Sequence, residues 1–115
     1  MTTSAIPAAV RFEGLSVGTD IWGATQANFL VSQPPAHAKE AAIMLNHPAA
    51  KLLADALGVE DNEAFRAEAA RVAGTLYLSE RIAEDLPIES VSSISHALFN
   101  ERPDLFDAVQ AALRK

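Results

Sequence analysis

An apolar stripe between residues 61 and 86 constrains the fold of this chain more than any other sequence feature. Its members follow one another at alternating steps of four and three residues: Phe65, Ala69, Val72, Leu76, Ser79, Ala83 and Leu86. This spacing places them on one face of an α-helix. Pro87 cannot continue the helix, so the helix ends at or before the residue that precedes it. The pattern predicts a long helix at about 61–86 that buries one face in the core.

The composition narrows the class of protein further. The chain has 115 residues, of which half are hydrophobic and 6% are aromatic, and alanine is its commonest residue. This length suits one domain, and alanine favours helices because it loses no side-chain entropy on ordering. With few large rings to bury, neighbouring helices are expected to approach closely around Ala69, Ala73 and Gly74. The absence of cysteine excludes disulfide frameworks, zinc fingers and thiol nucleophiles.

Prolines and capping residues divide the rest of the chain into short segments. Thr19-Asp20 can cap a helix that runs to about Ser32, and Pro34-Pro35 separates that segment from the next. Further helices are expected at about 36–46, 48–57, 90–100 and 103–113. The predicted fold is therefore all-α, a compact bundle of five to six helices around the long central helix at about 61–86, with residues 20–115 forming a single helical domain.

Residues 1–19 give a weaker signal and are predicted to form an irregular N-terminal arm, flexible or extended. Val10-Arg11-Phe12-Glu13 alternates between apolar and polar residues, and Gly14 and Gly18 interrupt the alternation. That short pattern fits either an edge strand or an extended arm.

Charge is the main indication of a binding surface. The formal net charge is −6, from 15 acidic and 9 basic side chains. Acidic residues gather at both ends of the long helix, and those at its C-terminal end oppose the helix dipole. A cluster that is locally unfavourable hints at a basic partner outside the chain. The candidate partner-binding residues are Glu60, Asp61, Glu63, Glu80, Glu84 and Asp85.

No motif for catalysis or cofactor binding accompanies these charges. The serines at 90, 92, 93 and 95 lack a G-x-S-x-G elbow, and the five glycines form no phosphate-binding loop. His37, His47 and His96 have no set of metal-ligand spacings around them and are interpreted as surface or cap residues. We therefore predict no catalytic residues, no metal ligands and no cofactor, and we expect that the protein is not an enzyme.

One short segment resembles a known family. Leu53-Ala54-Asp55-Ala56-Leu57-Gly58-Val59 is similar to the middle of a phage-repressor helix-turn-helix, with Ala54 and Gly58 at the small-residue and turn positions. The resemblance covers residues 50–70 and implies that Asn62, Arg66 and Arg71 contact DNA. The carboxylates that open the second helix would meet phosphate repulsion there, so a nucleic-acid partner is disfavoured.

The function predicted from these observations is that of a small acidic, non-catalytic protein-binding module, acting as a regulator, adaptor or inhibitor. Its partner is another protein, basic in character, or a second copy of the chain. Two alternatives stay open: a helix-turn-helix DNA-binding regulator that uses residues 50–70, and a small helical subunit of an enzyme complex. The N-terminal residues lack the basic and apolar regions of a signal peptide, and no apolar run is long enough to span a membrane. We therefore expect no signal peptide and a cytoplasmic location.

Overall fold

The protein combines a β-sheet with helices, so the predicted all-α bundle is wrong. The computed structural model describes residues 9–15, 23–33 and 37–114. Their elements follow the order β1 (Ala9–Leu15), β2 (Ala24–Ser32), β3 (Lys39–Asn46), α1 (His47–Leu57), α2 (Glu63–Ala83), β4 (Val91–Ile94), α3 (His96–Glu101) and α4 (Pro103–Leu113). Residues 20–115 are therefore not a purely helical domain.

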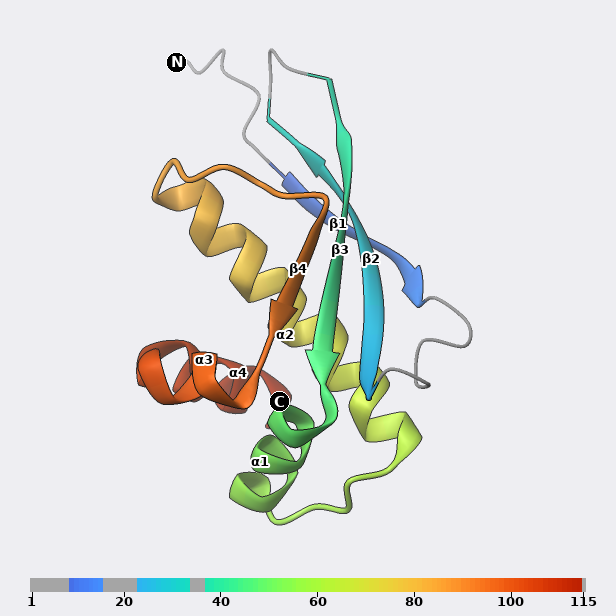
Figure 1. Cartoon of the computed structure of the whole chain (residues 1–115), viewed down its shortest axis with the longest axis vertical. Helices are drawn as coiled ribbons and strands as arrows, with labels where there is room; N and C mark the ends of the chain where they lie inside the picture. Colours follow the sequence, from blue (N-terminus) through green and yellow to red (C-terminus); the bar gives the residue numbers. More distant parts are fainter. Residues whose placement is uncertain (1–8, 16–22, 34–36, 115) are drawn as a thin grey trace.

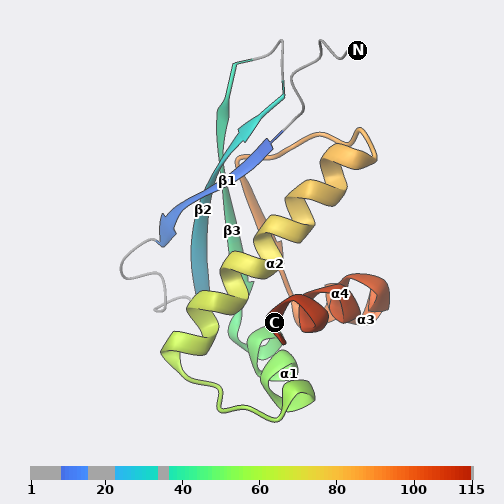
Figure 2. The same ribbon diagram turned by 180° about the vertical axis from the view of Figure 1, so that it is seen from behind.

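The four described strands form one mixed sheet in the order β1-β2-β3-β4. The first three are antiparallel to one another, and β4 lies parallel to β3. Helix α2 crosses one face of the sheet diagonally, while α1, α3 and α4 gather at the end where β3 and β4 stop (Figures 1 and 2). The core lies between the sheet and this layer of helices.

The helices predicted at 20–32 and 36–46 are wrong, because the described residues of these ranges contain the strands β2 and β3. The predicted cap, Thr19-Asp20, lies outside the described residues. Every second side chain in β2 is buried, with Ala27, Phe29 and Val31 all facing the core, and β3 repeats the pattern. Their register pairs Phe29 with Ala41 and Ala27 with Ile43, which packs small residues against large ones. A period of two matches a half-buried strand. Burial against α2 has therefore overridden the helix preference of the alanines.

The predicted helix at 90–100 is also wrong, because that segment is divided. Residues Val91–Ile94 form β4, and only His96–Glu101 are helical. Ser95 makes the division, since its Oγ accepts a hydrogen bond from the backbone N–H of Leu98 at 3.1 Å and so caps α3. The irregular arm predicted for 1–19 contains the edge strand β1, and the other residues of that range lie outside those described.

Three predicted helices, α1, α2 and α4, are confirmed. Gly58 ends α1 in the left-handed conformation, with φ of 70°, and the N–H of Val59 bonds to the carbonyl of Ala54 at 3.0 Å. The buried face of α2 differs from the predicted stripe, however, because Ser79 is exposed and Gly74 and Leu78 are buried. The close approach expected at Gly74 is made to Phe29 of the sheet, not to another helix.

Candidate functional site

The six acidic candidates do not form one surface. They occupy the two ends of α2, which has 21 residues and is about 30 Å long at the rise of an α-helix. Glu60, Asp61 and Glu63 lie at its beginning, near α1, and the other three lie at its far end (Figure 1). One helix or strand of a partner protein can therefore contact only one of these two acidic groups.

The group at the end of α2 includes a structural ion pair. The carboxylate of Glu80 lies 2.6 Å from Nη2 of Arg102, and the same guanidinium bonds to Asp104 at 2.7 Å. This bridge fastens α2 to the start of α4. Glu84 and Asp85 are exposed beyond it, with Asp85 at a φ of 58° in the turn that ends the helix. Of this group, Glu80 stabilises the fold, and only Glu84 and Asp85 face solvent.

The group at the start of α2 is also divided by an ion pair. Oδ1 of Asp61 accepts a hydrogen bond from Nε of Arg66 at 3.0 Å, and both side chains are partly buried. Glu60 and Glu63 are exposed. These two carboxylates are therefore the members of the group that a partner can reach.

The residues implied by the helix-turn-helix resemblance have roles within α2. Asn62 caps the helix, with its Oδ1 accepting from the N–H of Phe65 at 2.8 Å. Arg71 bonds to Glu68 through its Nε at 3.0 Å, and this hydrogen bond lowers the pKa of the Glu68 carboxyl and raises the pKa of the Arg71 guanidinium. Since Arg66 and Arg71 both bind carboxylates of their own chain, their charge is already partly compensated before any phosphate approaches.

A pocket beside Glu60 brings together parts of three helices. It has a volume of about 350 Å³ and lies between the end of α1, the loop that follows it, the first turns of α2 and the end of α4. The lining residues are Leu57, Val59, Glu60, Asn62, Phe65, Glu68, Leu113 and Arg114. Among the acidic candidates, Glu60 is the one that lines this pocket.

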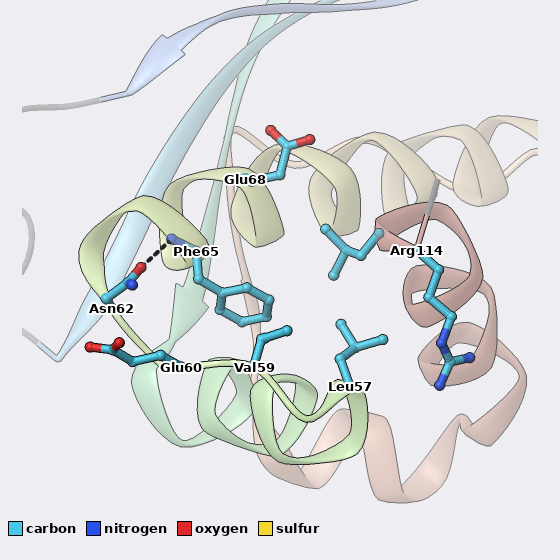
Figure 3. Close-up of a pocket in the computed structure, with 8 residues that line it drawn as sticks. Leu57, Val59, Glu60, Asn62, Phe65, Glu68 and Arg114 are labelled. Atoms are coloured by element: carbon cyan, nitrogen blue, oxygen red, sulfur yellow. Dashed lines mark hydrogen bonds between the residues drawn. The ribbon is translucent and has the colours of Figure 1, made fainter.

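The interior of the pocket is apolar and its rim is charged. The side chains of Leu57, Val59 and Phe65 converge on its centre, whereas the carboxylates of Glu60 and Glu68 point away from it (Figure 3). Val59 has 48% of its surface exposed although it is a large apolar residue. No charged group shown is directed at the centre (Figure 3). The arrangement suits the binding of an apolar group more than acid–base chemistry.

Sequence reasoning found the rim of this pocket but missed its interior. Glu60 and Asn62 were candidates, whereas Phe65 was assigned to the core stripe and Leu113 was included in the helix predicted at about 103–113. Both are only partly buried. The sequence signal available was Val59, an apolar residue between a helix-ending glycine and an acidic run, but its exposure depends on where α4 ends.

Other kinds of site receive no support from the part of the chain that the structure describes. Among residues 9–15, 23–33 and 37–114, no group of three or more histidine, aspartate or glutamate side chains could hold a metal ion. None of the helices over these residues has both the length and the apolar character needed to cross a membrane. The chain matches no family model, and it has no significant similarity to curated proteins or to solved structures.

Proposed function

We propose that this protein is a non-catalytic protein-binding module that holds an apolar side chain of a partner in the pocket between α1, α2 and α4. The observation that carries the proposal is the apolar interior of that pocket, with a half-exposed Val59 at its mouth. When a partner covers a large apolar side chain and removes it from water, the free energy of the complex falls, so such a side chain favours binding. A pocket of this kind suits the central anchor of a small interface.

The charged rim defines the chemistry of the partner. Glu60 is exposed on one side of the pocket mouth, and Arg114 lies on the opposite side, at the end of α4 (Figure 3). A lysine or arginine beside the anchor complements Glu60, and a carboxylate on the other flank complements Arg114. The expected ligand is a protein segment with a large apolar residue between a basic and an acidic one.

Selection from a random peptide library displayed on phage tests this proposal. Peptides that bind the wild-type protein should carry an apolar residue next to a basic one, and Val59→Asp should weaken their binding at least tenfold, because it places a charge in the apolar mouth. Leu86→Asp is the matched control, since Leu86 has a similar exposure of 40% and follows the far end of α2. Peptides that bind Val59→Asp as tightly as wild type would overturn the proposal.

The charge preference needs a separate variant. Glu60→Lys should weaken the binding of peptides that have a basic residue beside the apolar anchor. It should leave the circular dichroism spectrum unchanged, because Glu60 is exposed and precedes the helix. If the peptides selected by the wild-type protein instead carry an acidic residue on the side of the anchor that faces Glu60, the assigned orientation of the partner is contradicted.

A further inference from the structure

The outer edge of the sheet carries an interaction surface distinct from the pocket. Strand β1 is the first strand in the sheet order, so one side of it pairs with β2 and the other side pairs with no described strand. An edge strand presents unpaired backbone N–H and C=O groups that can bind another strand. Natural edges are often protected by lysine or proline, and β1, with the sequence AVRFEGL, has neither. Its edge carries instead two charged side chains and a bulge between Phe12 and Gly14.

Exposed apolar side chains mark the same edge. Phe12 has 37% of its surface exposed and Leu15 has 43%. Their register partners in β2, Phe29 and Ala27, face the core, so Phe12 and Leu15 lie on the face that α2 covers. The Phe12 ring packs edge-on against Phe29, with centroids 5.6 Å apart, and its remaining surface is open to a neighbour. The edge therefore offers apolar surface together with backbone hydrogen-bonding groups.

The charges that flank Phe12 make this strand complementary to itself. Arg11 precedes Phe12 and Glu13 follows it, and the two side chains contact each other at 2.7 Å on the exposed surface. If two copies pair antiparallel with Phe12 opposite Phe12, each Arg11 lies opposite the Glu13 of the other copy. A register centred on Arg11 or on Glu13 instead places like charges opposite each other, which is destabilising. The charges thus favour the register centred on Phe12 over those centred on Arg11 or Glu13.

We propose that the protein forms a homodimer in which the β1 strands of two copies pair antiparallel about Phe12 and join their sheets. The contact is isologous, as expected for a two-fold dimer. It brings the two Phe12 side chains together on the face that α2 covers and exchanges the Arg11–Glu13 contact within each strand for two contacts between strands. The bulge between Phe12 and Gly14 increases the local twist of β1.

Charge reversal tests the register directly. Light scattering after size exclusion should give twice the 12.2 kDa chain mass for the wild type. Arg11→Glu and Glu13→Arg should each raise the dimer dissociation constant at least tenfold, because each sets like charges opposite one another. The double variant R11E/E13R should restore dimerisation, since the opposite charges meet again in the same register.

Two results would overturn the dimer. One is a wild-type protein that stays monomeric at millimolar concentration, and the other is a pair of single variants that dimerise as well as wild type. Thermal unfolding of each variant at dilute, monomeric concentration separates loss of folding from loss of pairing. Val59→Asp should leave the dimer intact, and Arg11→Glu should leave peptide binding at the pocket intact, so failure of one proposal is distinguishable from failure of the other.

Discussion

Gly74 is the residue at which helix and sheet come closest. A methyl group at this position would lie 2.6 Å from Cε1 and Cζ of Phe29 and 3.3 Å from Cβ of Ile43. Both neighbours are fully buried, so neither ring nor branch can move into solvent. Glycine in the interior of α2 costs about 1 kcal/mol relative to alanine. The sequence retains that cost because the sheet occupies the space that a side chain needs.

Gly74→Ala should therefore destabilise the protein although it raises the helix propensity. Overpacking a core costs about 1–3 kcal/mol, which exceeds the gain of about 1 kcal/mol in propensity, and a net loss of about 1 kcal/mol is expected. Urea denaturation followed by circular dichroism measures it. Combining Gly74→Ala with Phe29→Leu should cost less than the two changes added together, because the smaller side chain makes room. Strict additivity would show that the contact is not the cause.

Asn62 is a second residue with a local structural role, although the helix-turn-helix resemblance implied that it contacts DNA. Its side chain caps α2 by accepting the N–H of Phe65 at 2.8 Å. Asn62→Ala should lower the free energy of unfolding by about 1 kcal/mol, whereas Asn62→Ser, which retains a capping oxygen, should lower it much less. Thermal unfolding of the two variants provides the comparison, and equal losses would exclude the cap as the source of the effect.

At the scale of the elements, sequence signals located helix ends better than strands. Gly58 and Pro103 act where a helix must end or begin, and their chemistry is the same in any fold, so α1 and α4 were predictable. Helix α2 was predictable from its apolar stripe, although its cap, Asn62, was not recognised. The strands β2 and β3 were not, because their alternation is made partly of alanines that also favour helices. What decides between the two is the partner strand and the face of α2, which a local pattern does not contain.

The ion pair between Arg102 and Asp104 at the start of α4 should make the stability of the protein depend on pH. The guanidinium of Arg102 bonds to Asp104 and Glu80, and its hydrogen bond lowers the pKa of the Asp104 carboxyl below the ordinary value. A carboxyl with a lowered folded-state pKa contributes stability above its unfolded pKa of about 3.9, and this stability is lost as the pH falls through the folded value. Unfolding midpoints measured from pH 6 to pH 2 should therefore fall more steeply for the wild type than for Asp104→Asn.

Arg102→Met provides the control for this pH effect. It removes the cation while retaining a long side chain, so the protein should be less stable at pH 6 and should differ less from the wild type at pH 2. Glu80→Gln tests the link between the helices separately, because it leaves the contact between Arg102 and Asp104 in place. Parallel pH profiles for all variants would contradict a role for Asp104 in acid stability.

For the whole molecule, the pocket and the sheet edge both depend on tertiary placement. Leu57 and Leu113 are 56 positions apart in the numbering of the chain, yet both line the pocket because α1 and α4 end beside each other. The apolar patch on β1 likewise depends on its being the outer strand. Sequence analysis could select Glu60 from its charge, but residues whose importance comes from exposed apolar area become recognisable only once the neighbours that leave them exposed are known.

The layered architecture also predicts how stability is distributed. Strands β2 and β3 each have a neighbouring strand on both sides, and α2 covers them. Amide hydrogens at 27–31, at 41–45 and in the middle of α2 should exchange slowest, at rates set by global unfolding. The short edge strand β4 and the single-turn region of α3 should exchange faster by at least tenfold. Slowest exchange in α1 and α4 would indicate that the helical end, not the sheet, is the stable core.

The same exchange measurement distinguishes a lone sheet edge from a paired one. The N–H groups of β1 that face away from β2 pair with no described strand in a single copy, and they become hydrogen-bonded when two copies pair. Their protection should therefore rise with protein concentration in the wild type, while the protection of β2 and β3 changes little. Arg11→Glu should abolish the concentration dependence, and R11E/E13R should restore it. Protection of β1 that is independent of concentration in all three proteins would mean that this edge stays unpaired between copies, because only pairing between molecules responds to mass action.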